Sequence, residues 1–433
     1  MSEPASHSTK DLRKAITLRH AVALYVSSVL GSGVLVLPGL SAKIAGPASL
    51  IAWVLLSLGS YPFAYTFASL SSRKPESGGV YAFAKESFGQ HVATVTGWLF
   101  ALWYITGGPA VILVAASYLN YAFPLARLDV YLIATIVTVG PFIINYRGIT
   151  FSNKVQVAVT VSIIGLLLAA IIASVGFVRR ENFSPFLPNG IIPIGTAAAL
   201  IFWSYLGYEN VSNVAEEFRD PKRDFHRSIT LSVVLIGFMY TAVAFVTVGT
   251  LAYEAGGSVA PFAAIFSNVL GSYGKAGTSF LAIFIIFGTA NAYTTGISRV
   301  IFVTAKDGGF PRSVYHLNEQ GVPDRGLILL FCSSVLVLAA YYFFDIDLEI
   351  ALMIPSGGAI LVYIIGSLAG IKLLKESGIR KTLPWMALIM SVVVLPFVGI
   401  WLLGAIIVAT VALIYSLVFS RSGTDVIMRT ASK

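Results

Sequence analysis

Charged residues are scarce in this chain. Asp, Glu, Lys and Arg make up 11% of its 433 residues, while 57% are hydrophobic and the mean hydropathy is +0.83. Soluble domains carry about 25% charged residues, so a soluble globular fold is excluded. Cysteine is almost absent, and Cys332, the single one, lies within an apolar run. An internal disulfide framework is therefore excluded, and the composition indicates an integral membrane protein.

The residue patterns of a catalytic or metal centre are also missing. No nucleophile stands beside a base in a recognisable motif. The histidines lie near the ends of apolar runs or in loops, without metal-ligand spacing: His7, His20, His91, His226 and His316. We expect no enzyme activity, no metal site and no bound cofactor.

Apolar runs long enough to cross a bilayer follow one another along the chain. They cover approximately residues 20–45, 48–72, 93–121, 128–146, 153–178, 192–215, 227–252, 277–305, 326–344, 348–373, 382–398 and 399–419. The division of the last region is the least marked, because Pro384 and Pro396 both interrupt it. We predict an all-α membrane protein of about twelve transmembrane helices.

Basic residues are distributed unevenly between the loops. If the N-terminus is cytoplasmic, the loops on the other side hold only five of the 29 Lys and Arg: Lys43, Arg127, Arg179, Arg180 and Lys275. The positive-inside rule then predicts a multi-pass protein of the cytoplasmic membrane with cytoplasmic tails at 1–19 and 420–433. We expect the first span, rather than a cleaved leader, to direct insertion. The net charge of +9 would face anionic lipid, not nucleic acid.

The first span contains the sequence Gly31-Ser32-Gly33 in its middle. Each glycine in a helix interior costs roughly 1 kcal/mol relative to alanine, so we expect the helix to break here. In a bilayer such a break is tolerated where the freed backbone groups face a cavity or a ligand. The second half-helix would present its N–H groups to an anion such as a carboxylate. Close packing of a neighbouring helix on the two glycines explains this stretch equally well.

The sixth span carries both a glycine, Gly207, and an ionisable residue, Glu209. An ionisable residue at membrane depth indicates a functional site. A structural hydrogen bond that holds two half-helices together is the other interpretation, and the two are compatible. Because five spans separate this interruption from the first, the pattern indicates two five-span repeats, 20–178 and 192–374, with 382–419 at the periphery. Paired interruptions of this kind are typical of inverted-repeat transporters with a site at the bilayer midplane.

Two further spans are rich in polar or aromatic residues. The third contains Trp103 and Tyr104 followed by Gly107, Gly108 and Pro109, which suits either a cavity wall or a packing kink. The eighth carries Tyr293 and Arg299 among several Thr, Ser and Asn residues, so this face should contact protein or water rather than lipid. The mixed-charge stretch 216–224 after the sixth span is typical of a solvated turn.

Several motifs in order resemble the amino acid–polyamine–organocation (APC) superfamily over most of the chain. They are Leu30 to Val34 ending at Pro38, Pro75 to Tyr81, Phe202 to Glu209 followed by 220–223, and Ala305 to Pro311. Within the superfamily, Val95 to Phe100 and Phe202-Trp203 resemble the bacterial exporters of methionine and branched-chain amino acids. The resemblance implies the leucine-transporter fold, which has two inverted five-helix repeats plus two extra helices, and transport by alternating access.

The resemblance also implies a set of substrate-binding positions. The substrate carboxylate would meet the backbone N–H groups and hydroxyl at Ser32 and Gly33, and the ammonium would meet the carbonyls of Val29, Trp203 and Leu206. Trp203 would also gate or stack on the substrate. The expected binding residues are Ser28, Val29, Gly31, Ser32, Gly33, Tyr104, Trp203, Ser204, Leu206 and Tyr293, and the expected coupling or gating residues are Trp203, Glu209 and Arg299.

The coupling mode stays open between uniport, exchange and a proton route through Glu209. Proton-coupled relatives place a lysine in the fifth span near Thr160, and this chain has none there. Arg299 argues against a sodium ion between the first and eighth spans.

The expected pocket walls favour a neutral, apolar amino acid as substrate. They include Tyr205, Ser356 and Gly357, and Glu209 is the only acidic side chain near them. The alternatives are a cationic amino acid or amine held by aromatic faces, and a transport-like sensor.

Overall fold

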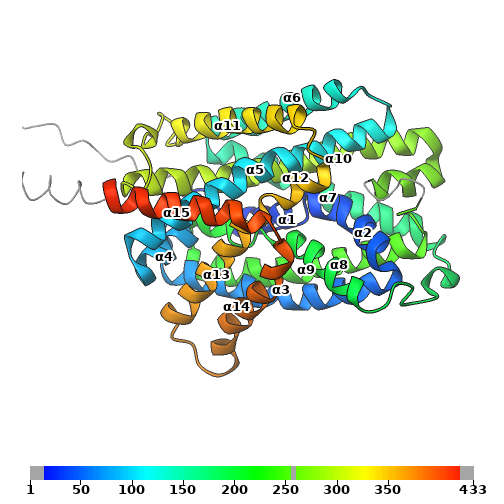
Figure 1. Ribbon diagram of the computed structural model, residues 1–433, viewed down its shortest axis with the longest axis horizontal. Coiled ribbons are helices and arrows are strands. Elements are labelled where there is room, and N and C mark those ends of the chain that lie inside the picture. The colour runs from blue at the N-terminus through cyan, green and yellow to red at the C-terminus, as the bar shows by residue number, and fades with distance from the viewer. Residues whose placement is uncertain (1–13, 255–259, 420–433) are drawn as a thin grey trace, which may run out of the picture.

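The computed structural model describes residues 14–254 and 260–419, and within these ranges every extended regular element is a helix. Most of the long helices run roughly along the long axis of the molecule (Figure 1). Nine helical stretches of the described chain are long and apolar enough to cross a membrane, and one of them, Leu18–Arg73, contains three consecutive helices. The protein is therefore an all-α, multi-pass membrane protein, as the composition predicts.

The helix bounds follow the apolar runs of the sequence. The helices are α1 (Leu18–Val29), α2 (Ser32–Ala45), α3 (Ser49–Arg73), α4 (Val80–Phe88), α5 (Gln90–Ala122), α6 (Arg127–Tyr146), α7 (Ile149–Val175), α8 (Ile192–Phe202), α9 (Pro221–Gly249), α10 (Pro261–Lys306), α11 (Asp324–Phe343), α12 (Leu348–Met353), α13 (Ser356–Leu373), α14 (Leu383–Val394) and α15 (Trp401–Phe419). Two short 3₁₀ segments, η3 (Trp203–Tyr205) and η4 (Asn210–Glu217), continue the course of α8.

The two predicted helix interruptions are confirmed. α1 ends at Val29 and α2 begins at Ser32, with Gly31 at φ −69° and ψ −117°, outside the helical region. α8 ends at Phe202, and the chain passes through Gly207, whose φ of 135° favours glycine, before η4 begins. Glycine therefore supplies the backbone freedom that the second break requires.

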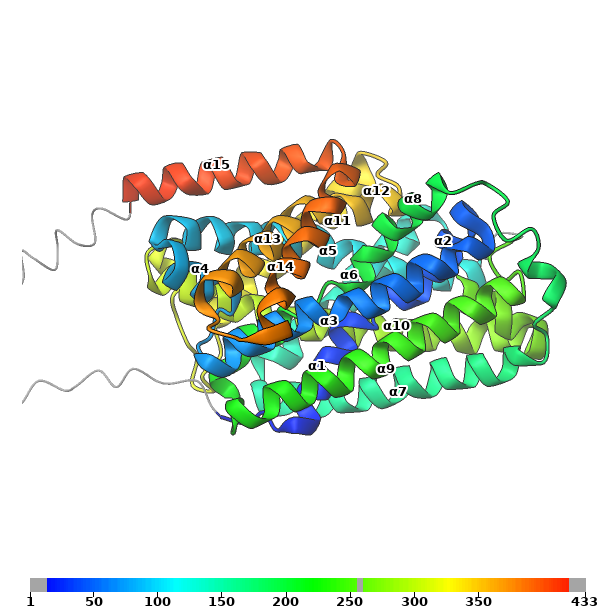
Figure 2. The same ribbon diagram turned by 90° about the horizontal axis from the view of Figure 1, so that it is seen from below.

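The interrupted helices pack against each other, and α2 and α8 lie side by side (Figure 2). α1 packs on η4, α2 packs on α8, and α9 and α10 contact both α1 and α2. A Cβ atom added at Gly207 would lie 3.1 Å from the carbonyl oxygen of Ser28, and one added at Gly33 would lie 3.1 Å from the Cα of Ser204. The backbones of the two breaks thus approach each other closely, and a side chain added at Gly33 or Gly207 would require the neighbouring chain to shift.

Other helices surround this centre. α10 is longer than the predicted 277–305 because it begins at Pro261, and it bends at Gly271, where φ is 60°. α15 runs along the outside of the bundle and packs on α5 (Figure 2), with many side chains exposed, as expected for a peripheral helix. The start of α1 and the end of α15 lie at the same end of the bundle, together with α4 (Figure 2). We call this the N-terminal end.

Candidate substrate cavity

A cavity of about 40 Å³ lies between the two helix breaks. Residues from α1, α2, α5, α10 and the segment after α8 form its walls: Ser28, Val29, Ser32, Gly33, Phe100, Trp103, Tyr104, Gly107, Gly108, Val111, Ser204, Leu206, Thr289, Ala290 and Tyr293. None of these residues carries a formal charge. The cavity is small and largely apolar, with a few polar groups where the helices are interrupted.

Most of the binding residues predicted from the sequence line this cavity. They are Ser28, Val29, Ser32, Gly33, Tyr104, Ser204, Leu206 and Tyr293. Gly31 is not among the lining residues, because it packs against α10, where a Cβ atom would lie 1.8 Å from Oγ1 of Thr289. The backbone of Trp203 belongs to η3, but its side chain lies outside what the structure describes.

Three predicted pocket walls lie elsewhere. The hydroxyl of Tyr205 is 2.6 Å from the hydroxyl of Ser57 on α3, so this side chain points away from the cavity. Ser356 and Gly357 do not line the cavity, and a Cβ atom at Gly357 would lie 2.9 Å from the carbonyl oxygen of Trp401. The start of α13 therefore packs against α15 and supplies no wall.

The polar groups of the cavity suit a small zwitterion. Ser32 and Gly33 begin α2, whose first N–H groups have no intrahelical acceptor, and the N-cap residue Gly31 provides no side-chain cap. The hydroxyl of Ser204 faces the cavity without a hydrogen-bond partner among the described residues. The hydroxyl of Ser28 accepts a hydrogen bond from the side-chain amide of Asn210 at 3.1 Å. An N-terminal helix end of this kind attracts an anionic group.

Tyr240 on α9 fixes both breaks from outside the cavity. Its hydroxyl donates to the backbone carbonyl of Val29 and lies 2.9 Å from the carbonyl oxygen of Ser204. The side chain is completely buried and packs against Trp53 and Tyr205. Sequence reasoning missed this residue, because a tyrosine in an apolar span carries no signal of what its hydroxyl contacts.

Glu209 is fully buried but does not line the cavity. Its Oε2 atom accepts hydrogen bonds from the backbone N–H of Gly207, at 2.9 Å, and from the hydroxyl of Tyr363 on α13. The same N–H also lies 2.9 Å from the Tyr363 hydroxyl oxygen. Glu209 therefore joins the interrupted segment to α13, and these bonds do not hold two half-helices to each other.

We expect Glu209→Gln to retain most of the transport activity, because the amide oxygen can accept the same two hydrogen bonds. Counterflow should stay within about threefold of wild type, whereas Glu209→Ala, which loses both bonds, should lower it by about tenfold or more. The two variants should be compared in proteoliposomes at equal protein content. A Gln variant as inactive as the Ala variant would show that the carboxyl group itself is required.

Arg299 also lies away from the cavity. It forms an ion pair with Glu217 at the end of η4, with 2.9 Å between Nε and Oε1. The side chains of both residues are only 1% exposed. The interpretation of 216–224 as a solvated turn is therefore wrong for Glu217, because a buried arginine from a distant helix pairs with it.

The comparison with known proteins agrees with this architecture. Residues 16–430 match the family model of the amino acid permeases. The chain is 35% identical over 379 residues to YecA, an uncharacterized amino acid permease of Bacillus subtilis (strain 168), covering 87% of this chain and 89% of the relative. It is 29% identical over 397 residues to YjeH, the L-methionine/branched-chain amino acid exporter of Escherichia coli (strain K12), covering 90% and 92%.

A plant relative is similar over much of the same region. The chain is 28% identical over 383 residues to the cationic amino acid transporter 3, mitochondrial, of Arabidopsis thaliana, covering 81% of this chain and 61% of the relative. The relatives named here are permeases and transporters, not enzymes. With a family model that matches almost its whole length, this chain belongs to the amino acid permease family of the APC superfamily and is an amino acid transporter.

Proposed function

We propose that this protein moves neutral, apolar L-amino acids across the cytoplasmic membrane by alternating access. The observation that carries the proposal is the uncharged cavity between the two helix breaks. In this scheme the N–H groups at Ser32 and Gly33 receive the carboxylate, and the carbonyls of Val29, Trp203 and Leu206 receive the ammonium. The aromatic and aliphatic walls surround the substrate side chain, as hydrophobic binding sites generally do.

The fold proposed for this function is the leucine-transporter fold with about twelve spans. Its inverted repeats would be 20–178 and 192–374, and 382–419 would form two peripheral helices. The tails 1–19 and 420–433 would lie in the cytoplasm. The opposed breaks at Gly31 and Gly207 support this arrangement, since discontinuous helices at the repeat interface are typical of such carriers.

We propose that transport proceeds by uniport or by exchange rather than by coupling to protons. On α7, Nε2 of Gln156 donates to the carbonyl oxygen of Gly288 at 3.0 Å, and Oγ1 of Thr160 donates to that of Ala23 at 3.0 Å. Neutral donors on α7 thus bond to backbone carbonyls of α1 and α10 in the region where proton-coupled relatives place a lysine. A proton route through Glu209 predicts instead that a pH gradient drives accumulation.

The test is counterflow in proteoliposomes. The vesicles are loaded with unlabelled leucine or methionine, the same labelled amino acid is added outside at trace level, and the experiment is repeated with arginine and with an amine. Accumulation with the neutral pairs alone is the expected result. Accumulation only with arginine or the amine would assign a cationic substrate, and binding without accumulation would indicate a sensor.

Gly108 on α5 should set the size of the accepted side chain. A Cβ atom there would lie 3.6 Å from the ring of Tyr104, an ordinary contact, so alanine fits the backbone but takes space from the cavity. We expect Gly108→Ala to lower leucine transport relative to alanine transport by about fourfold, because one methyl-sized group is worth ~0.8 kcal/mol. The measurement is the ratio of the two counterflow rates. An unchanged ratio would place the substrate side chain elsewhere.

A further inference from the structure

The cytoplasmic route of a carrier must open and close, and the N-terminal end of this bundle contains a contact suited to closing it. There the segment before α1 is bound to the end of η4. The backbone N–H groups of Ala15 and Ile16 donate to the carbonyl oxygen of Glu217 at 2.9 and 2.8 Å, and the N–H of Arg219 donates to the carbonyl oxygen of Ile16 at 3.0 Å. These bonds tie α1 and η4, one half of each interrupted helix, into a single unit.

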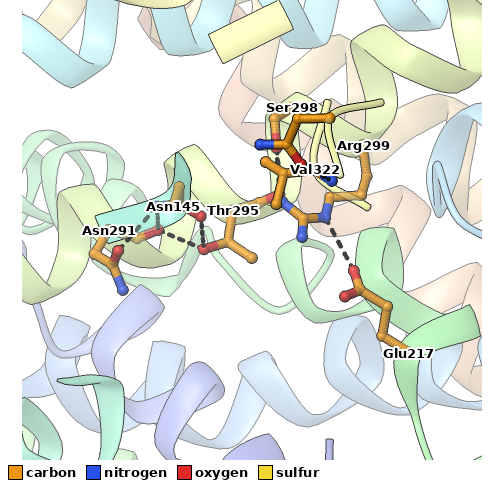
Figure 3. Close-up of polar contacts among 8 residues, drawn as sticks. Asn145, Glu217, Asn291, Thr295, Ser298, Arg299 and Val322 are labelled. Carbon is orange, nitrogen blue, oxygen red and sulfur yellow. Dashed lines mark hydrogen bonds and ion pairs between the residues drawn. The ribbon is translucent and has the colours of Figure 1, made fainter. Parts of the chain in front are cut away.

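The ion pair between Glu217 and Arg299 joins this unit to α10 (Figure 3). Arg299 is held on its own helix by further bonds from Nη1, to the carbonyl oxygen of Thr295 at 3.2 Å and to the hydroxyl oxygen of Ser298 at 2.9 Å. Among the ion pairs of residues 14–254 and 260–419, it is the one in which both side chains are almost fully buried. Glu217 thus connects the N-terminal segment, η4 and α10.

Neutral side chains bridge the same interface nearer the cavity. The side-chain amide of Asn210 on η4 donates to the carbonyl oxygen of Ala292 on α10 at 3.0 Å. Asn291 on α10 donates to Oε1 of Gln156 at 2.7 Å, and Gln156 in turn donates to the hydroxyl of Ser27 on α1. Water can replace neutral bonds of this kind at little cost when the helices separate.

The free-energy cost of breaking the ion pair depends on whether water reaches the two charges. Buried charges are stable only while paired, and a single charge left in a dry site is strongly unfavourable. Water entering between η4 and α10 would hydrate both charges and so permit them to part. The pair therefore has two stable arrangements, paired and dry or separated and hydrated, which is what a reversible closure requires.

We propose that the Glu217–Arg299 ion pair closes the N-terminal end of the transport route and breaks once in each cycle, when α1 and η4 move together away from α10. Glu217 and Arg299 are positioning residues, since neither lines the substrate cavity. The inference rests on the proposed alternating-access function, and it adds the contact that controls access to the site from this end.

The test measures how readily a thiol on η4 can be reached. Cys332 is the only cysteine, so Cys332→Ala gives a cysteine-free background. Ser212→Cys then places a single thiol on η4 at a position that is fully buried. A charged, membrane-impermeant thiol reagent is applied from the N-terminal side to purified, reconstituted carrier without substrate, and the labelling rate is measured.

Two variants should move this rate in opposite directions. Glu217→Gln leaves the Arg299 charge unpaired in the closed form, so labelling should accelerate by about tenfold or more. The double variant Glu217→Leu/Arg299→Met removes both charges and makes the closed interface apolar, so labelling should become slower than wild type, and transport should fall with it. Glu216→Gln is the matched control, because it makes the same charge change at the neighbouring residue, and it should label at the wild-type rate.

A purely structural brace would give a different result. Labelling that is unchanged in both variants, or that shifts in the same direction in both, would overturn the proposal, as would loss of folded protein in both. If Glu217→Gln alone fails to fold, the double variant is the test. Labelling slower than wild type would support the closing contact, and labelling at the wild-type rate or faster would overturn it. Counterflow by the wild type is measured separately, so a carrier that transports but shows no change in labelling refutes only the closing contact.

Discussion

Replacing Gly33 by leucine is expected to reduce counterflow by about a hundredfold or more, because overpacking at this position and loss of the binding space act together. A Cβ atom at Gly33 would lie 2.7 Å from Oγ and 3.1 Å from Cα of Ser204. The backbone at the second break would therefore have to move. The remaining atoms of the leucine side chain would extend into the region where Gly33 lines the cavity.

The matched control for this variant is Gly165→Leu on α7. No atom lies within 4 Å of a Cβ added there, and the position is exposed on the outer surface of the bundle. We expect this control to transport at the wild-type rate and both proteins to insert in the membrane in similar amounts. Normal uptake by Gly33→Leu would refute the assignment of the binding site.

Tyr240→Phe should raise the KM for leucine by about tenfold, since it removes the one hydroxyl hydrogen that the carbonyls of Val29 and Ser204 share and leaves buried acceptors without a donor, at a cost of about 1–3 kcal/mol. The two carbonyls belong to different breaks, so the variant should loosen the geometry of the whole site. The maximal rate should change less than KM, because Tyr240 lies outside the cavity.

Tyr205→Phe provides the comparison for this effect. Tyr205 is also buried, and its ring packs against that of Tyr240, but its hydroxyl bonds to Ser57 on α3, away from the cavity. Its removal should change KM by less than about twofold, because the net value of such a bond is small when its partners can bond elsewhere. Equal effects of the two substitutions would mean that Tyr240 acts through general packing.

The helix breaks could be predicted because they depend on local chemistry, whereas most of the cavity residues are expected from the family resemblance. Gly31 and Gly33 interrupt an apolar run, and Gly207 stands two residues before a carboxylic acid at membrane depth. Each feature is unfavourable in a continuous membrane helix, so each indicates an interruption without knowledge of its neighbours. Eight of the ten binding residues that the family resemblance implies lie together around the cavity, and six of these eight stand at the two interruptions.

The remaining features depend on partners that are distant in the sequence. Glu217 lies in a stretch with the composition of a solvated turn, yet it is buried and paired with Arg299, which is distant in the sequence. Phe100 and Val111 line the cavity, yet apolar residues in a span look the same whether they face substrate or a neighbouring helix. Gly31 and Gly33 are only two residues apart but face different partners, Thr289 and Ser204. Tertiary packing sets all these differences.

The central proposal is that backbone groups at the two breaks bind both charges of a neutral amino acid. The most direct test measures how unlabelled competitors reduce the counterflow of labelled leucine. The three competitors have similar shapes: leucine, 3-methylbutylamine, which lacks the carboxylate, and 4-methylpentanoate, which lacks the ammonium. We predict that unlabelled leucine competes fully and that neither singly charged analogue competes at the same concentration. Competition by the amine as strong as that by leucine would contradict the proposal, because the site would then recognise a cation without its carboxylate.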